Sequence, residues 1–181
     1  MKNDTQKTLN VQENITDINE IIRQAEKLQE LCTKYGFNAF QPGAIKELKM
    51  ATILNHNWIC NKAQADACSP DGKKLYEYLS ATENGNCQID RFFKDGAGDQ
   101  HEKHLKSMQR IWRNDCFYLA FTSENTSKPL DILRIYQVST EEIEKETLRQ
   151  LSKSRNDISH IGFDEEFARF HGKLIFTKES E

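Results

Sequence analysis

The sequence lacks long apolar runs and paired cysteine motifs. No apolar run approaches the roughly 18 residues of a membrane-spanning helix, and the polar start Met1–Gln6 lacks the apolar segment of a secretory signal. The five cysteines, at positions 32, 60, 68, 87 and 116, form no Cys-x-x-Cys pair. This spacing favours reduced, mostly buried thiols over disulfides or a zinc site. We therefore expect a cytoplasmic protein with no membrane partner.

The chain also lacks an excess of positive charge. Its net charge of -3 and pI near 6.0 give no global attraction to nucleic acid, so any contact with DNA must come from a local basic surface. There is no internal repeat and no low-complexity segment. A length of 181 residues suits one domain, and we expect residues 1–181 to form it.

The N-terminal part of the chain predicts one amphipathic helix. Residues 1–12 are polar, and we expect them to be flexible; the helix lies within 13–36, capped by Thr16 or Asp17 and ended by Gly36. Its apolar side chains recur at helical spacing. This stripe indicates either a core contact or a dimer contact. Its members are Ile18, Ile21, Ile22, Ala25, Leu28, Leu31 and Cys32.

The rest of the chain predicts an α/β fold, with a catalytic core at 43–138 and a C-terminal helix with short strands at 139–181. A second helix opens at Pro42-Gly43 and carries Glu47 close to its apolar face. Strand-like runs follow at 58–60, 64–68, 74–81 and 86–93, and they predict an antiparallel meander. A basic helical segment then extends through Trp112.

The later elements predict the centre of the sheet. Cys116–Phe121 is a continuous apolar run, typical of a strand buried on both faces, and Leu130–Val138 alternates as its neighbour would. Ser139 and Glu142 form a capping box for a helix that ends near Lys153. Leu174–Phe176 predicts the last strand. We expect a central mixed β-sheet flanked by helices.

Two acidic residues on consecutive strands are the candidate site. Asp66 and Glu77 flank a Pro70-Asp71-Gly72 turn, whose Pro presets φ and whose Gly accepts a positive φ. Two carboxylates brought together repel unless a cation lies between them, and hard oxygen ligands suit Mg²⁺ or Mn²⁺. Lys73 or Lys74 is an alternative source of the cation. A surface hairpin with solvated charges is the other interpretation.

These residues carry a resemblance to a known family. The motifs are a helix with an inward Glu, then Asn61-Lys62-x-x-Ala-Asp66-Ala, an Asp-Gly turn, Tyr-Glu77-Tyr, and Cys-Gln88-Ile-Asp-Arg91. Together they resemble the PD-(D/E)xK nuclease superfamily, and within it type II restriction endonucleases of the PvuII-like branch. The resemblance covers mainly residues 43–93 and extends in element order to Val138. It implies a restriction-endonuclease-like core and a Mg²⁺-dependent enzyme that hydrolyses phosphodiester bonds of double-stranded DNA as a homodimer, with Mn²⁺ as a second candidate cofactor.

The resemblance also implies roles for single residues. Asp66, Glu77 and the backbone carbonyl of Tyr78 would hold the metal, and Glu47 would be a further carboxylate of the catalytic set. A solvated helix residue is the alternative for Glu47. Residues with donor groups suited to phosphates or bases are candidates for DNA contact, although salt bridges or solvated faces explain them as well. These candidates are Asn61, Gln88, Arg91, Lys106 and Arg110.

Leu79 occupies the position at which the family carries a catalytic lysine. Strand alternation places Leu79 on the face of Glu77, and three explanations are open. The basic group comes from elsewhere, with Lys62, Lys49 or Arg91 as candidates; a second metal or Gln88 replaces it; or the protein is a DNA-binding or regulatory form that no longer cleaves. An unrelated α/β interaction protein with an incidental acidic hairpin is the third functional interpretation.

Overall fold

The computed structural model describes residues 15–60 and 65–179, and the chain divides into two compact units between Ala44 and Ile45. The first unit contains helix α1 (Ile15–Thr33) and the turns after it, where Gly36 has a φ of 79°. The predicted N-terminal helix is confirmed, although it ends at Thr33. Its apolar side chains include the exposed Ile21 and Leu31, at 66% and 52%. The prediction for residues 1–12 lies outside the described residues.

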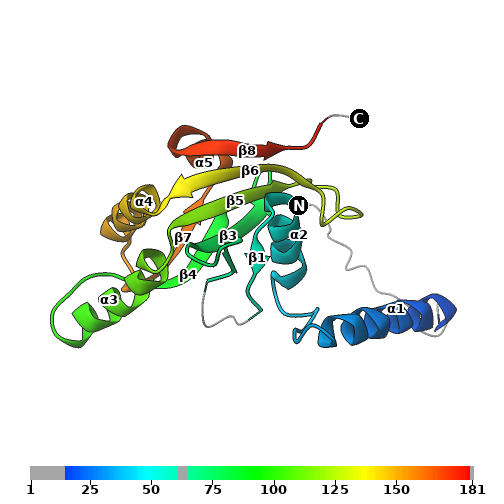
Figure 1. Cartoon of the computed structure of the whole chain (residues 1–181). Helices are drawn as coiled ribbons and strands as arrows, with labels where there is room; N and C mark the ends of the chain where they lie inside the picture. The colour runs from blue at the N-terminus through cyan, green and yellow to red at the C-terminus, as the bar shows by residue number, and fades with distance from the viewer. Residues whose placement is uncertain (1–14, 61–64, 180–181) are drawn as a thin grey trace, which may run out of the picture. The chain divides into compact units, whose positions relative to one another are not determined.

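A six-stranded mixed sheet is the centre of the second unit (Figure 1). Its order is β1-β2-β3-β5-β6-β8, with β3 parallel to β5 and the other neighbours antiparallel. This architecture confirms the α/β class with a central mixed sheet flanked by helices. The strands are β1 (Asn57–Trp58), β2 (Ala67–Cys68), β3 (Leu75–Thr82), β5 (Cys116–Thr122), β6 (Ile132–Ser139) and β8 (Gly172–Thr177).

Strand β5 lies in the middle of this sheet. All seven of its residues are buried, as its continuous apolar run predicts. Its antiparallel neighbour β6 is also the one that the sequence predicts, with Leu119 opposite Tyr136. On the other side β5 runs parallel to β3, with Phe117 opposite Glu77. The candidate acidic strand is therefore paired directly with a strand that is buried along its whole length.

The predicted meander is wrong beyond β3. Strand β4 (Cys87–Phe93) leaves the main sheet and pairs antiparallel with β7 (Ile158–Phe163) in a separate two-stranded ribbon. Its pattern explains this placement, because Cys87, Ile89 and Phe92 are buried while the residues between them are exposed. A strand with one polar face suits a covering layer, whereas the fully apolar β5 requires the central place beside β3.

The sheet packs on both of its faces (Figure 1). On one face, Leu79 and Phe117 pack with α3 (Asp99–Trp112), α4 (Thr140–Lys153), α5 (Glu165–His171) and the β4–β7 ribbon. On the other face, Tyr76 and Tyr78 pack against α2 (Ala44–Leu54). Alternate residues of β3 thus belong to different layers, as strand geometry requires.

The start of α4 confirms the predicted cap. The Ser139 side chain accepts a hydrogen bond of 3.2 Å from the backbone N–H of Glu142. The predicted last strand is confirmed as β8, and the helix through Trp112 as α3. All five cysteines are free, and Cys32, Cys87 and Cys116 are buried.

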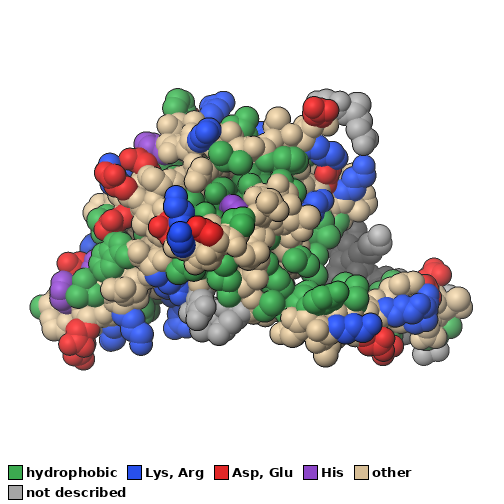
Figure 2. Space-filling model, in the orientation of Figure 1, with side chains coloured by type: hydrophobic (Ala, Val, Ile, Leu, Met, Phe, Trp, Pro, Cys, Tyr) green, Lys and Arg blue, Asp and Glu red, His purple; other side chains and the backbone are tan. Residues whose placement is uncertain are grey.

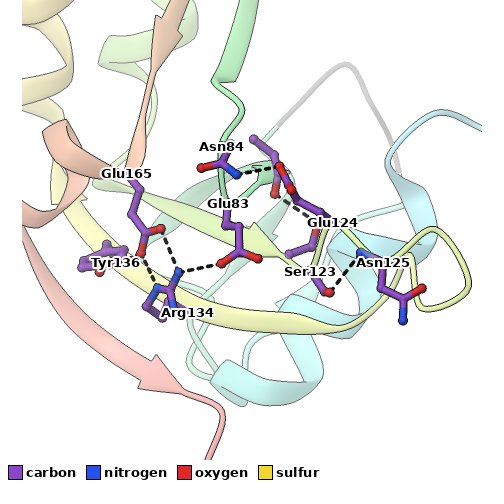
Figure 3. Close-up of polar contacts among 10 residues, drawn as sticks. Glu83, Asn84, Ser123, Glu124, Asn125, Arg134, Tyr136 and Glu165 are labelled. Carbon is purple, nitrogen blue, oxygen red and sulfur yellow. Dashed lines mark hydrogen bonds and ion pairs between the residues drawn. The ribbon is translucent and has the colours of Figure 1, made fainter. Parts of the chain in front are cut away.

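A polar network ties together the end of β3, strand β6 and helix α5 (Figure 3). The Arg134 guanidinium donates to Glu165 and, at 3.5 Å, to Glu83 just after β3; the Tyr136 hydroxyl donates to Glu165 at 3.0 Å. Glu83 lies six residues beyond Glu77, or about 20 Å along an extended strand. The network therefore fixes the far end of β3.

The part of the chain that the structure describes contains no helix with the length and apolar character needed to cross a membrane.

Candidate metal centre

The acidic hairpin is built by the turn that the sequence predicts. The backbone N–H of Gly72 donates to the Ser69 carbonyl at 2.8 Å, and Gly72 has a φ of 71°. The Ser69 hydroxyl donates to Asp71, and the Ser69 N–H donates to the Lys74 carbonyl at 2.9 Å. These bonds close the connection between β2 and β3 and set their register, with Ala67 opposite Tyr76.

Asp66 is fixed at the start of β2, one residue before the paired positions. It is only 7% exposed, its Oδ2 atom accepts a 2.9 Å hydrogen bond from the backbone N–H of Tyr78, and its own N–H donates to the Tyr76 carbonyl. The carboxylate therefore lies against β3 rather than in solvent. Extending the β2–β3 register by one residue puts Asp66 beside Glu77.

Glu77 enters the site from β3 with a side chain that is 13% exposed. Its Oε2 atom lies 3.5 Å from a guanidinium nitrogen of Arg113 and 3.4 Å from the amide nitrogen of Asn114. Its Oε1 atom accepts no hydrogen bond from the residues that the structure describes. Both carboxylates are thus largely buried, which excludes the interpretation of a surface hairpin with solvated charges.

The electrostatics of Glu77 reflect this burial. The pKa of Glu77 is raised to about 7, first by burial and then by the negative charge of Asp66, while Arg113 and Arg110 act in the opposite direction. When a buried carboxyl group has a raised pKa, a nearby cation stabilises its ionised form. The two carboxylates therefore form a site that favours bound positive charge.

Tyr78, which directly follows Glu77 in the sequence, anchors the opposite face of β3. The Tyr78 hydroxyl lies 2.7 Å from Nδ1 of His56, and the His56 ring packs against the rings of Tyr76 and Tyr118, with centroids 4.4 and 5.1 Å away. Burial lowers the pKa of His56 and raises that of Tyr78. This aromatic cluster holds the backbone of β3 whose N–H group binds Asp66.

The donor set of the site fits a hard divalent cation. Within residues 15–60 and 65–179, no group of three His, Cys, Asp or Glu side chains is arranged to hold a metal. Mg²⁺ needs no such group, because it is usually bound by one or two carboxylates and retains several waters. Asp66 and Glu77 supply two carboxylates, and the Tyr78 carbonyl is the third candidate ligand.

Glu47 and Lys49, the two candidate residues of helix α2, have different surroundings. Glu47 is buried, at 8% exposed, and accepts a 3.4 Å hydrogen bond from the Trp58 indole. Its burial excludes the solvated-helix interpretation. Lys49 donates to the Leu130 carbonyl, so its ammonium group is engaged at the start of the β6 region. Lys49 is therefore a weak candidate for the missing lysine.

The position at which PD-(D/E)xK nucleases carry a lysine is, in this chain, part of the core. Leu79 is 9% exposed and packs in the apolar cluster that contains Phe117 and residues of α3. The lysines of the turn do not replace it: Lys73 is exposed and pairs with Asp71 at 3.7 Å, and Lys74 is exposed. Among the described residues, the cation in contact with Glu77 is the guanidinium of Arg113.

The candidates for DNA contact are spread over two elements. Gln88 and Arg91 are exposed on β4, and Arg91 has a positive φ of 61° at the irregularity between Ile89 and Phe92. They belong to the ribbon with β7, not to a strand beside the acidic hairpin, so the expected adjacency in one sheet is wrong. Asn61 and Lys62 lie outside the described residues.

Helix α3 carries the other two candidates. Lys106 is exposed, and Arg110 donates to the Asp90 carbonyl and stacks 5.6 Å from the centre of the Phe92 ring. Where α3 lies in Figure 1, Figure 2 shows basic, acidic and His side chains side by side. Acidic Asp99 and Glu102 in the first turn of α3 account for this mixture. Arg110 connects this surface to the acidic site, because its charge also acts on Glu77.

The residue that sequence reasoning missed is Asn114. Its amide nitrogen bridges Glu77 and the Arg110 carbonyl, at 3.4 and 2.8 Å, and it is 4% exposed. Arg113 directly follows the basic helical segment that extends through Trp112. The sequence feature that could have identified Arg113 and Asn114 is their position just before the apolar strand β5, which pairs with β3.

Comparison with known proteins gives no family assignment: the chain matches no protein-family model and no curated protein.

Proposed function

We propose that the chain is a Mg²⁺-dependent endodeoxyribonuclease, of the type II restriction class, in which Asp66 and Glu77 bind the cation. One observation carries this proposal: two largely buried carboxylates are held together by the β2–β3 register. Burying two like charges is unfavourable without a cation. Because a defined turn and two strands hold this unfavourable arrangement in place, we infer that the two carboxylates bind a cation.

The roles of the protein groups follow from their positions. Asp66 is oriented by the Tyr78 N–H, and Glu77 meets Arg113 and Asn114 through its Oε2 atom. A divalent cation held there would polarise the scissile phosphate and favour an ionised water nearby. In the overall reaction, water adds across one P–O ester bond and yields a phosphate monoester and a hydroxyl group. Mn²⁺ is expected to substitute for Mg²⁺, because it accepts the same oxygen ligands.

The element order supports the resemblance to PD-(D/E)xK nucleases. Helix α2 with a buried Glu47 precedes the hairpin, and α3 then leads to β5, which runs parallel to the acidic strand. We propose that this set is a restriction-endonuclease-like core and that Glu47 contributes to the catalytic set through water. Gln88, Arg91, Lys106 and Arg110 are proposed to contact the DNA.

A homodimer is proposed because a two-fold symmetric DNA site is matched by a two-fold protein. The exposed apolar residues of α1, such as Ile21, Ile22 and Leu31, support this helix as the contact between subunits. Five free cysteines fit a reducing compartment, so we propose that the enzyme acts in the cytoplasm.

Leu79 favours one alternative function. A chain that has replaced the lysine by a core leucine would bind DNA, or regulate a partner, without cutting. Both functions use the same fold and the same DNA surface, and they differ only in hydrolysis.

The test combines cleavage with a measurement of metal binding. Plasmid and mixed-sequence duplex DNA are incubated with the protein in Mg²⁺ or Mn²⁺, and Ca²⁺ binding is measured by calorimetry. We expect discrete fragments that disappear with EDTA, and a loss of at least about 100-fold in cleavage and of Ca²⁺ binding in Asp66→Ala and Glu77→Ala. Asp71→Asn is the matched control, because Asp71 is an exposed carboxylate of the same hairpin. Absence of Ca²⁺ binding in the unmodified protein would refute the metal site, and tight DNA binding without cleavage would favour the alternative.

A further inference from the structure

The junction between α3 and β5 presents a cation to the acidic hairpin. Arg113 is the residue that caps the C-terminal end of α3, where its N–H still donates to the Gln109 carbonyl. Its guanidinium approaches Oε2 of Glu77 to 3.5 Å, and its side chain is 30% exposed, so it lies at the edge between the buried site and solvent. A group in this position can contact both a buried carboxylate and a molecule bound from outside.

The junction is held rigidly against β3. The Asp115 carboxylate accepts a 2.7 Å hydrogen bond from the Leu75 N–H, and the Asp115 N–H donates to the Leu75 carbonyl at 2.8 Å. The Asn114 carbonyl accepts a 2.7 Å hydrogen bond from the Thr140 hydroxyl. These contacts fix the residues on the C-terminal side of Arg113. The fold thus holds the backbone that carries Arg113 in a fixed place beside β3, and preorganised groups of this kind suit a site of chemistry.

Both partners of Glu77 act on the same oxygen. Arg113 and Asn114 contact Oε2, whereas Oε1 accepts no hydrogen bond within the described part of the chain. The Asn114 carbonyl oxygen of the side chain is buried and has no hydrogen-bond partner there. The positive charge of Arg113 therefore acts at Oε2, and Oε1 makes no hydrogen bond to the described residues that would compete with a bound cation.

We propose that Arg113 supplies the positive charge that Leu79 lacks: it balances Glu77 in the metal-free protein and contacts a phosphate oxygen when DNA is bound. This inference rests on the proposed nuclease function. An arginine suits the role, because its planar guanidinium stays charged and has enough N–H groups to hold a carboxylate and a phosphate together. Lysine on the strand is then unnecessary, and the strand position is free to be filled by a core leucine.

The proposal predicts opposite changes in metal binding and in catalysis. In Arg113→Met the cation that repels and competes with a divalent ion is lost, so Ca²⁺ affinity at pH 8.5 should rise by about threefold or more. In the same variant, DNA cleavage at saturating Mg²⁺ should fall by about 100-fold or more, since one donor to the reacting phosphate is missing. Arg113→Lys keeps a charge and should be affected less in both measurements.

A merely structural role gives a different pattern. Disruption of the site would weaken Ca²⁺ binding and cleavage together, and this outcome would overturn the proposal. Arg149→Met is the matched control, because Arg149 is an exposed arginine that pairs with Glu146 within α4, and it should change neither quantity. Unchanged Ca²⁺ affinity in Arg113→Met would also overturn the proposal.

The two hypotheses fail in distinguishable ways. If the unmodified protein binds Ca²⁺ but cuts no DNA, the nuclease function is refuted and the phosphate role of Arg113 with it, while tighter Ca²⁺ binding in Arg113→Met would still support its charge-balancing role. If the unmodified protein cuts DNA and Arg113→Met cuts equally well, the nuclease function stands and the assignment of Arg113 is refuted.

Discussion

Replacing Glu77 by glutamine should change how the stability of the metal-free protein depends on pH. The Glu77 carboxyl has a pKa of about 7 in the folded protein, against an ordinary value of 4.5. The folded state therefore holds this proton more strongly than the unfolded state. Stability from this group is fully present below about pH 4.5 and is lost as the pH rises through 7.

The size of the effect follows from the pKa difference. Each tenfold change in a protonation equilibrium is worth about 1.36 kcal/mol, so ionising Glu77 in the folded protein costs about 3 kcal/mol. Its side chain is only 13% exposed, so solvent screens little of this cost. Glutamine has the same shape and no proton to lose. Glu77→Gln should therefore match the unmodified protein near pH 4.5 and exceed it by about 3 kcal/mol at pH 8.

The assay is urea unfolding in EDTA, followed by tryptophan fluorescence between pH 4.5 and 8.5. The quantity of interest is the difference in unfolding free energy between the variant and the unmodified protein, because pH effects of other groups cancel in it. Glu102→Gln, at an exposed position of α3, is the control and should show a difference near zero throughout. A difference for Glu77→Gln that stays constant with pH would refute the buried, charge-repelled site. Asp66→Asn should remove only part of the pH dependence of the unmodified protein, since burial is the larger cause.

Variants at three further positions test the strands and the turn that hold the site. Leu79→Lys places an ammonium group in the apolar cluster and should lower the unfolding free energy by at least about 2 kcal/mol, whereas Leu79→Met should cost less than about 1.5 kcal/mol; equal stability of the two would show that position 79 is open to solvent. Gly72→Ala should cost about 1–2 kcal/mol in urea unfolding through its φ of 71° alone, because no atom lies within 4 Å of the added Cβ, and an unchanged midpoint would contradict the turn. Phe117→Ala, at a fully buried position of β5, should cost about 3–5 kcal/mol by the same assay, and a cost below about 1 kcal/mol would place β5 outside the core.

Local chemistry made much of this fold predictable. The Pro-Asp-Gly turn, the Ser139 cap and the apolar run of β5 each depend on residues close in sequence, and each is confirmed. The pairing partner of β4 was not predictable in the same way. A strand with alternating apolar residues can join any sheet that buries one of its faces. The neighbour of β3 is decided by β5 instead, because its apolar side chains on both faces must be buried.

The candidate site shows the same division. Asp66 and Glu77 lie on strands joined by a tight turn, so their proximity follows from the hairpin. Glu47 could be expected to be buried from its helical periodicity, and it is. Arg113 and Asn114 lie 36 and 37 residues from Glu77, and their contact arises only because β3 and β5 pair in parallel with a helical crossover between them. No spacing rule along the chain encodes that contact.

The parallel pairing also explains why the leucine at position 79 does not settle the question of activity. In a strand, the residue two positions after Glu77 shares its face, but in this chain that face is the layer packed against α3. A lysine there would have to place its ammonium group in the apolar cluster that now contains Leu79, whereas Arg113 at the end of α3 already contacts Oε2 of Glu77. The fold thus offers two routes for a positive charge to the same carboxylate, one along the strand and one from the crossover. Leucine at position 79 adds an apolar side chain to the core, and Arg113 at the end of α3 still brings a positive charge to Glu77.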